Sequence, residues 1–296
     1  MAFPATKRWL AMTSTTPDSA PIRAVISDVD GTLVTTSKLL SQRAQAAVAD
    51  LRARGIQFTI ISSRPPRGMR MLLAPLGISA PIAAFNGGII AAADTTVVAE
   101  HLIAGEVARR TLQLFDQRGV DIWVFAGTDW LVRDFHSPYV AHEARTVGFG
   151  AKLVSDFAPF LASAAKIVGV SEDYDLLARC EQELIGEVGA RATVARSQLY
   201  YLDITHPLAN KGTAIMALTR LMAVSLAEIA VLGDGRNDIA MFAVSGFSIA
   251  MGNASAEVKA AATSVTASNE EEGFAKAIEQ FVLPRIARRA SGQAVG

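Results

Sequence analysis

A short apolar segment that runs into an acidic turn places the strongest constraint on the fold of this chain. Residues 22–27 are mostly apolar and partly β-branched, and the turn that follows reads Asp28-Val29-Asp30-Gly31-Thr32. This combination is typical of a buried strand that leaves the core and enters a loop. The segments at 57–61 and 82–85 have the same character, so we expect them to be strands as well.

Segments of helical composition separate these strands. They lie at 41–54, where Ser41 is a plausible N-cap, and at 67–76, which follows two prolines that suit the first turn of a helix. The same rhythm returns near the end of the chain, with a helix at 211–223, a strand at 229–232, a loop at 233–238, a strand at 246–250 and helices at 254–263 and 274–288. Strands that alternate with helices predict right-handed crossovers and a parallel sheet.

The middle of the chain has a different pattern. Residues 121–125 and 130–135 flank a four-residue connection that suits a hairpin, and residues 198–204 alternate as a half-exposed strand does. We therefore predict an α/β fold with a Rossmann-like parallel-sheet core and an inserted α+β cap domain. The core would comprise 22–89 and 208–288 and the cap 90–207. A flexible leader at 1–21 and a flexible tail at 289–296 complete the expected organisation.

Composition narrows the functional classes. The chain has 296 residues, of which 51% are hydrophobic and 19% charged, so it can bury a sizeable core. Twenty-eight basic residues balance 28 acidic ones, which removes the overall electrostatic argument for a nucleic-acid partner. Its one cysteine, Cys180, cannot form an internal disulfide. We expect a cytoplasmic protein with no membrane partner, because no apolar run reaches the roughly 18 residues of a membrane span.

Four aspartates stand where the predicted parallel strands end. Asp28 and Asp30 follow the first strand, and Asp234 and Asp238 follow the strand at 229–232. Parallel strands end in a common crevice, so groups far apart in the sequence can meet there. Clustered carboxylates repel one another, and a hard divalent cation such as Mg²⁺ compensates for their charge. The cluster therefore predicts a magnesium site, with a phosphoryl substrate as the remaining ligand.

Three further residues fit an anionic substrate. Ser62 ends a strand beside a helix that prolines begin, and the free N–H groups of such a helix favour an anion. Lys211 opens a helix and could place a cation near the phosphate. Asn86, with Gly87 and Gly88 behind it, offers an amide and a close approach of the backbone.

These motifs resemble those of a known family. Asp28-Val29-Asp30-Gly31-Thr32-Leu33, Ser62-Ser63-Arg64-Pro65, Asn86-Gly87-Gly88, Asn210-Lys211-Gly212 and Gly233-Asp234-Gly235-Arg236-Asn237-Asp238 look like the motif series of haloacid dehalogenase (HAD) superfamily phosphatases. The large insertion and the segment Ala250-Met251-Gly252-Asn253-Ala254 are similar to the Cof-like subfamily with a type IIB cap. One departure is Ser62-Ser63, where this subfamily usually has Thr-Gly.

The resemblance implies a role for each residue. Asp28 would be the nucleophile that forms an aspartyl-phosphate, and Asp30 would protonate the leaving oxygen and then activate water. Asp28, the backbone carbonyl of Asp30 and Asp234 would hold Mg²⁺, with Asp238 acting directly or through water. Ser62 and Lys211 would bind the phosphate, assisted by Asn86 and Asn237. A second acid two residues from the nucleophile can have a different environment, so we expect Asp30 to remain protonated.

The leading prediction is a HAD-type phosphomonoester hydrolase that depends on Mg²⁺ and acts on small phosphorylated metabolites, with sugar phosphates the first expectation. It would act as a monomer or homodimer. A phosphotransferase or phosphomutase would use the same aspartyl-phosphate. A signalling receiver domain also clusters aspartates, but the long insertion and Asp30 argue against it. A non-catalytic module that binds phosphometabolites would be expected to lack Asp28 or Asp30, and both are present.

Overall fold

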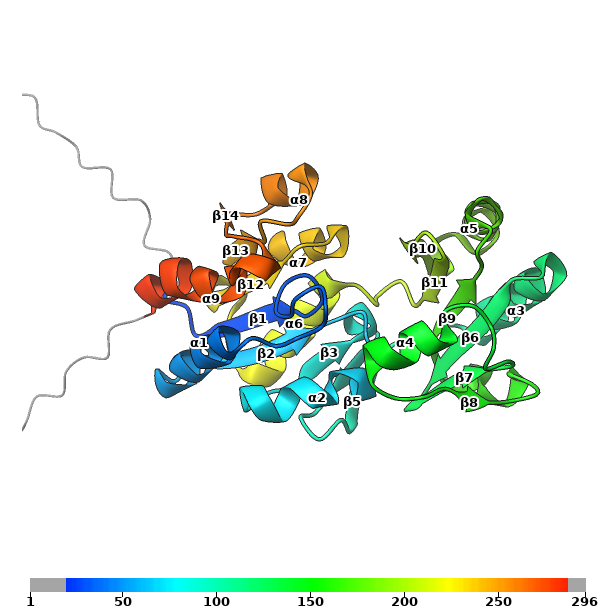
Figure 1. The fold of residues 1–296 in the computed structure, drawn as a ribbon, viewed down its shortest axis with the longest axis horizontal. Coiled ribbons are helices and arrows are strands. Elements are labelled where there is room, and N and C mark those ends of the chain that lie inside the picture. Colours follow the sequence, from blue (N-terminus) through cyan, green and yellow to red (C-terminus); the bar gives the residue numbers. More distant parts are fainter. Residues whose placement is uncertain (1–19, 287–296) are drawn as a thin grey trace, which may run out of the picture.

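The computed structural model of the chain describes residues 20–286, which form two lobes, each built around its own β-sheet (Figure 1). Most of the predicted leader at 1–21 and the whole predicted tail at 289–296 lie outside the described residues. Between residues 20 and 286, no helix is both long enough and apolar enough to cross a membrane. The cytoplasmic location stays a prediction.

The larger lobe contains an eight-stranded sheet. In sheet order its strands are β14 (Ser264–Val265), β13 (Phe247–Ala250), β12 (Ile229–Gly233), β1 (Ala24–Asp28), β2 (Gln57–Ile61), β3 (Ile82–Ala84), β4 (Ile89–Ala91) and β5 (Val97–Glu100). The first six are paired in parallel, whereas β4 and β5 are antiparallel additions at one edge. The predicted parallel core is therefore confirmed.

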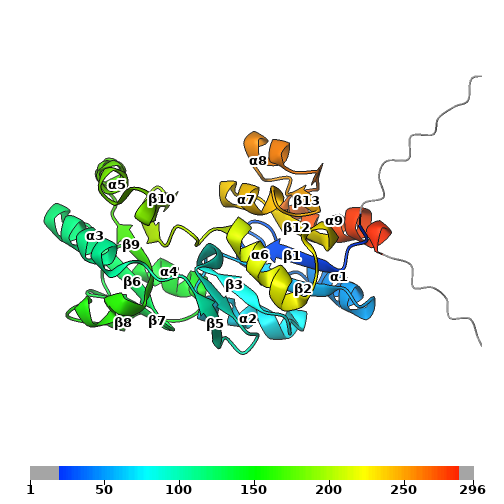
Figure 2. The same cartoon turned by 180° about the vertical axis from the view of Figure 1, so that it is seen from behind.

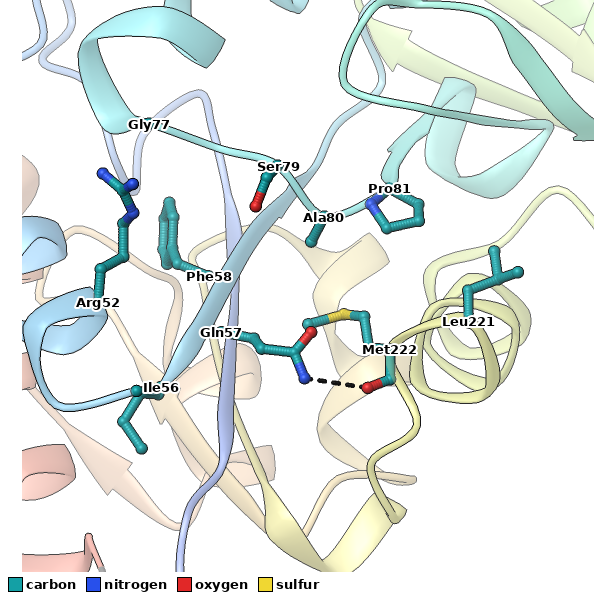
Figure 3. A pocket seen from close by; sticks show the side chains of 11 residues that line it. Arg52, Ile56, Gln57, Phe58, Gly77, Ser79, Ala80, Pro81, Leu221 and Met222 are labelled. Carbon is teal, nitrogen blue, oxygen red and sulfur yellow. Dashed lines mark hydrogen bonds between the residues drawn. The ribbon is translucent and has the colours of Figure 1, made fainter.

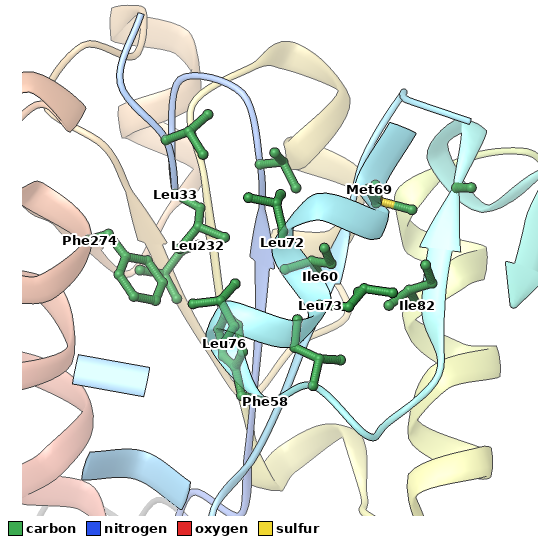
Figure 4. Packing of buried hydrophobic residues seen from close by; sticks show 14 of the residues in the cluster. Leu33, Phe58, Ile60, Met69, Leu72, Leu73, Leu76, Ile82, Leu232 and Phe274 are labelled. Carbon is green, nitrogen blue, oxygen red and sulfur yellow. The ribbon is translucent and has the colours of Figure 1, made fainter. Parts of the chain in front are cut away.

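Helices cover both faces of this sheet (Figures 1 and 2). The helices of the larger lobe are α1 (Gln42–Ala53), α2 (Pro66–Leu76), α6 (Lys211–Met222), α7 (Ile239–Phe242), α8 (Ala256–Ala261) and α9 (Gly273–Ala277). Alternate strand residues point to opposite faces. Phe58 and Ile60 pack with α1, α2 and α9, whereas Ile26 and Ile61 pack with α6 and α7. Figure 4 shows Phe58 and Ile60 among the side chains of α2 and Phe274 of α9.

The predicted closing helix at 274–288 is broken in the structure. After α9 the chain continues as a π-helical turn (Ile278–Val282) and a 3₁₀ turn (Leu283–Arg285). Pro284 has no backbone N–H and cannot join a regular α-helix at this point, which explains the change of winding.

The smaller lobe has a six-stranded sheet. In sheet order its strands are β10 (Thr193–Gln198), β11 (Tyr201–Thr205), β9 (Ala164–Val170), β6 (Asp121–Ala126), β7 (Asp129–Val132) and β8 (Lys152–Leu153). All pairs are antiparallel except β7 with β8. The long helices α3 (Gly105–Arg118) and α5 (Tyr174–Val188) pack on one face of this sheet. The short helix α4 (Val140–Val147) lies at the junction with the larger lobe (Figure 1).

The observed pairing moves one expected boundary. We expected the insertion to begin at residue 90, but β4 and β5 pair with the sheet of the larger lobe. A hairpin that extends the edge of a sheet looks, in the sequence, like the start of an antiparallel insertion. We therefore propose that the core extends to Glu100, where β5 ends, and that the cap begins with the connection that follows.

Candidate active site

The centre of the site is a buried lysine between two aspartates. Asp28 is the last residue of β1, and Lys211 is the first residue of α6, a helix that the side chain of Asn210 caps. Nζ of Lys211 lies 2.5 Å from Oδ1 of Asp28 and 2.5 Å from Oδ1 of Asp238. The lysine side chain is only 1% exposed, so these two carboxylates are its direct charge partners.

The loop after β12 holds the carboxylates of Asp234 and Asp238 in place. Oδ2 of Asp238 accepts the backbone N–H groups of Asp234 at 2.9 Å and Gly235 at 2.8 Å. The hydroxyl of Thr32 donates to Oδ1 of Asp234 at 3.1 Å, and Nδ2 of Asn253 donates to its Oδ2 at 3.1 Å. The tight turn after β12 and its partners therefore orient both carboxylates toward the end of β1.

Asp28, Asp234 and Asp238 form a group that could hold a metal ion, because one carboxylate oxygen from each lies within 4.8 Å of the others. Burial raises the pKa of Asp28 to about 8; Lys211 opposes the rise, and Asp238 and Asp234 add to it. Burial and the charge of Asp238 also raise the pKa of Asp234. One lysine thus leaves the three carboxylates short of positive charge, and a hard divalent cation with oxygen ligands fits this donor set.

The pKa of Lys211 responds to the same charges. Burial alone would lower it, but the carboxylates of Asp238 and Asp28 outweigh burial and hold it above its usual value. Lys211 is therefore a permanent cation at the end of β1, where a phosphate group would be attracted to it.

Asp30 lies apart from this group. Its two carboxylate oxygens accept hydrogen bonds from Nε and Nη2 of Arg64, both at 2.7 Å, and Oδ1 also accepts one from Nζ of Lys38 at 2.7 Å. Burial opposes ionisation, but the hydrogen bonds and charges of Arg64 and Lys38 outweigh it and hold the pKa of Asp30 below its ordinary value. The expectation that Asp30 remains protonated is wrong for this arrangement, because a two-pronged arginine contact favours the carboxylate.

The predicted phosphate-binding residues lie beside one another. Ser62 directly follows β2, whose Ile61 pairs with Asp28, and its hydroxyl accepts the backbone N–H of Arg64 at 3.1 Å. The backbone N–H of Asn86 donates to the carbonyl of Ser62 at 2.8 Å. Nδ2 of Asn237 donates to Oδ1 of Asn86 at 3.0 Å. The structure thus brings all three to the same end of the sheet, although it does not test their roles.

Two glycines allow the motifs to approach closely. Gly31 has φ +79°, and a Cβ there would lie 2.3 Å from Oδ2 of Asp234. Gly87 has φ +102°, and a Cβ there would lie 2.5 Å from the Cβ of Ala214 in α6. A side chain at Gly31 would therefore displace an acidic residue of the site, and one at Gly87 would push away the helix that Lys211 begins.

Arg64, Thr32 and Asn253 contact the acidic residues, yet sequence reasoning assigned none of them a role. Each lies inside a sequence motif quoted above, so membership of the motif was the one signal that could have pointed to these residues. Their partners could not be read from it, because Asn253 reaches Asp234 and the carbonyl of Gly31 from a separate loop.

A cavity of about 430 Å³ lies at the other end of the sheet, where β2 begins (Figure 3). Its wall includes Arg52, Pro81 and Gln57, whose side-chain amide donates to the carbonyl of Met222 at 3.0 Å. None of the predicted site residues lines it. The candidate site is therefore identified by the side chains at the carboxyl ends of the parallel strands, and not by the volume of this cavity.

Comparison with known proteins agrees with this geometry. The profile of the haloacid dehalogenase-like hydrolases matches residues 25–278, so the chain belongs to that family. An HMP-PP phosphatase of Cronobacter sakazakii is 27% identical over 227 residues, which are 77% of this chain and 83% of the relative. A crystal structure of a haloacid dehalogenase-like hydrolase from Bacteroides thetaiotaomicron has a TM-score of 0.81 at 28% identity, covering 87% of this chain and 98% of that one.

A further solved structure bears on the cap. A protein described as a HAD subclass IIB sugar phosphatase has a TM-score of 0.75 at 22% identity and covers 88% of this chain and 98% of that one. This likeness shows the fold alone. Together the comparisons confirm the predicted family, the core with an inserted cap and the class of phosphomonoester hydrolase.

Proposed function

We propose that this chain is a Mg²⁺-dependent phosphatase that hydrolyses small phosphorylated metabolites through a phosphoryl group carried on Asp28. The observation that supports it most is the convergence of Asp28, Asp234 and Asp238 on one point beside Lys211. Relatives named as phosphatases of small phosphorylated compounds support the substrate class, and sugar phosphates are its first candidates.

Asp28, Asp234 and Asp238 would hold the ion, together with the backbone carbonyl of Asp30 that the family resemblance implies. When bound, Mg²⁺ would supply the positive charge that these carboxylates lack and would draw electron density from the phosphoryl group. Asp238 also accepts hydrogen bonds from two backbone N–H groups and from Nζ of Lys211. It therefore keeps the loop after β12 in position whether or not it touches the ion.

In the first step a carboxylate oxygen of Asp28 would attack phosphorus, and the bond from phosphorus to the ester oxygen would break. The leaving oxygen would take a proton from Asp30 and depart as an alcohol. In the second step water would attack the phosphoryl group on Asp28, Asp30 would accept the proton from that water, and inorganic phosphate would leave. Lys211 would stabilise the negative charge of the phosphoryl oxygens in both steps.

The ion pair of Asp30 with Arg64 suits one of these steps better than the other. A carboxylate is what the second step needs as a base. For the first step Asp30 must gain a proton, so the contacts with Arg64 and Lys38 must loosen once substrate is bound. Ser62 and Lys211 would meanwhile bind the phosphoryl oxygens, assisted by Asn86 and Asn237.

The test is release of inorganic phosphate from p-nitrophenyl phosphate by wild type and by Asp28→Asn. We expect the variant to lose kcat by on the order of 10³-fold or more, because an amide is a poor nucleophile. The matched control is Asp50→Asn, a surface residue paired with Arg54, which should keep full activity. Excess EDTA should abolish the activity, and added Mg²⁺ should restore it.

Full activity of Asp28→Asn, or of wild type in EDTA, would contradict the proposal. Including a sugar as an acceptor separates the phosphotransferase alternative. Release of phosphate in proportion to substrate consumed supports hydrolysis, whereas quantitative transfer to the sugar hydroxyl would overturn it.

A further inference from the structure

A polar cluster occupies the face of the cap sheet that is turned toward the core. It consists of Glu143, Lys166, Tyr201 and Asp203, here called the cap-face cluster. Nζ of Lys166 in β9 lies 2.6 Å from Oδ2 of Asp203 in β11, and the two side chains are only 12% and 14% exposed. Tyr201 and Asp203 share a strand face because they are two residues apart. Their neighbours Leu202 and Ile204 point the other way and pack in the cluster beneath α3 and α5.

Contacts with the core place this face next to the candidate active site. Phe125 pairs with Lys166 across the cap sheet, and its ring centroid lies 5.3 Å from that of Phe85, the residue before Asn86. Helix α4, which carries Glu143, packs on α2, where a Cβ at Gly68 would lie 3.2 Å from the Cβ of Val147. Helix α2 begins just after Arg64, the arginine that holds Asp30.

Glu143 connects the cluster with the catalytic residues. Burial raises the pKa of this carboxyl group, and Lys166, Asp203, Arg64 and Asp30 all contribute to its electrostatic environment. The charges of the cap ion pair and of the core ion pair therefore both act on this one carboxyl group. A substrate held by its phosphate at Lys211 would extend its other end toward this point.

The cluster contains polar atoms that lack a partner within residues 20–286. Oδ1 of Asp203 is buried without a hydrogen bond, and the hydroxyl of Tyr201, whose side chain is only 8% exposed, lies near the carboxyl group of Glu143 without a hydrogen bond of normal geometry. A buried polar atom without a partner is unfavourable, because it has lost its hydrogen bonds to water and gained none in return. One hydroxyl that can donate and one carboxylate oxygen that can accept would both be satisfied by hydroxyl groups of a ligand.

The charge of the cluster limits which ligand fits. The cluster has a single cation, Lys166, and Asp203 already pairs with it through Oδ2. The free Oδ1 of Asp203 would repel a second anion in this poorly solvated site. A leaving group with a second phosphate or a carboxylate would therefore be repelled, whereas neutral hydroxyl groups could bind the free oxygens.

We propose that the cap-face cluster binds the leaving group of the substrate and selects a hydroxyl-rich leaving group that carries no second anionic group. This inference rests on the proposed phosphatase function and names the part of the substrate that the cap recognises. Asp203 and Glu143 act as specificity residues through their charge, and Tyr201 acts through its hydroxyl.

The experiment compares kcat/KM for sorbitol 6-phosphate and 6-phosphogluconate, two open-chain substrates with a phosphate on a primary carbon, which differ in that the second has a carboxylate in place of the terminal CH₂OH group. Wild type should prefer sorbitol 6-phosphate by at least about tenfold, the equivalent of about 1.4 kcal/mol. Asp203→Asn and Glu143→Gln should each reduce this preference by about fivefold or more. Asp116→Asn is the control, because Asp116 pairs with Arg133 on the cap surface and should leave the preference unchanged.

Tyr201→Phe tests the hydroxyl without removing a charge or the aromatic ring. It should raise KM for sorbitol 6-phosphate by about tenfold, the loss expected for one hydrogen bond. In Tyr201→Phe, turnover of p-nitrophenyl phosphate, whose leaving group has no hydroxyl to bind, should fall by less than turnover of sorbitol 6-phosphate. Circular dichroism reports that each variant is folded.

Two results would overturn the inference: an unchanged substrate preference in Asp203→Asn and Glu143→Gln, or an unchanged KM in Tyr201→Phe. Equal losses on all three substrates would also overturn it, because they would indicate a purely structural role. A wild-type protein that fails to hydrolyse even p-nitrophenyl phosphate with Mg²⁺ would instead contradict the proposed function itself.

Discussion

Lys211 and Asp28 are 183 residues apart in the chain, yet the lysine Nζ lies 2.5 Å from the aspartate Oδ1 in the interior of the core. The same ammonium group contacts Asp238, so it links the first acidic loop with the last. The insertion of a whole second lobe between these residues does not disturb the contact. Parallel strands make this possible, because β1 and β12 are neighbours in the sheet and both end at this point.

Lys211→Met tests the contribution of this cation. Removing it leaves two buried carboxylates without their partner, so we expect the free energy of unfolding to fall by about 3–5 kcal/mol. We also expect kcat to fall by on the order of 10²-fold or more, because the phosphoryl oxygens lose a stabilising charge. Urea denaturation and phosphate release measure the two effects. Lys152→Met, at a side chain that is 59% exposed, should change neither, and equal behaviour of the two variants would contradict the assignment.

Gly31→Ala and Gly55→Ala form a matched pair. The two glycines have φ values of +79° and +78°, but only a Cβ at Gly31 would strike Asp234, whereas one at Gly55 would meet nothing within 4 Å. Both variants should lose about 1–2 kcal/mol of stability from the left-handed backbone. Only Gly31→Ala should raise the Mg²⁺ concentration needed for half-maximal activity. Titration with Mg²⁺ decides the matter, and identical midpoints would show that Asp234 does not hold the ion.

Arg64→Gln tests the ion pair that holds Asp30. Because the folded-state pKa of Asp30 lies below its ordinary value of about 3.9, its stabilising contribution is present above that pH and is lost as the pH falls through the folded-state pKa. The variant should therefore be less stable than wild type by about 2 kcal/mol at pH 7. The difference should shrink below about pH 4.

Urea denaturation at pH 7 and at steps of pH from about 4 down to about 2 measures this change. Arg67→Gln serves as its control, since Arg67 lies over the ring of Phe149 and touches no acidic residue of the site. A stability difference that stays constant with pH would show that Arg64 acts through packing and not through the charge of Asp30.

The two connections between the lobes carry stacked histidines, and their stability should depend on pH. The rings of His101 and His206 have centroids 5.2 Å apart, and Nδ1 of His206 accepts the N–H of Leu208 at 3.0 Å. Burial, with a smaller effect from His101, lowers the pKa of His206. A lowered pKa favours the neutral ring in the folded state, so this stabilisation is present above about pH 6.5 and is lost as the pH falls below it.

His206→Asn keeps an acceptor but cannot titrate. Between pH 7.5 and pH 5.5 the wild-type Tm should fall by roughly 1–2 °C more than that of the variant. The exposed His142→Asn should behave as wild type does. If the Tm values of wild type and His206→Asn change with pH in parallel, His206 does not cause the pH dependence of stability.

The parallel core could be predicted because its signals are local. Residues 57–61 and 229–232 are short apolar runs that end in polar turns, and each became a strand of the expected kind. The acidic cluster could be predicted for the same reason, since Asp28, Asp234 and Asp238 sit at the ends of such strands.

Features that depend on contacts between distant segments could not be predicted from local sequence patterns. The sequence between 89 and 100 does not reveal which sheet its hairpin will join, so the expected start of the cap at residue 90 differs from the start after Glu100 that we propose. The charge state of Asp30 depends on Arg64, which lies 34 residues away, and on how its guanidinium group is oriented. Spacing along a chain carries no information on that orientation.

The most direct test of the account is to trap the phosphoryl group. In Asp30→Asn the second step should slow, because water loses its base, while p-nitrophenolate can still leave without a proton. Rapid acid quenching during turnover with Mg²⁺, followed by mass spectrometry of the digested protein, should find one phosphoryl group on the peptide and side chain of Asp28. The double variant Asp28→Asn with Asp30→Asn should show none. A phosphoryl group on another residue, or none in an Asp30→Asn protein that still turns over, would contradict the central claim.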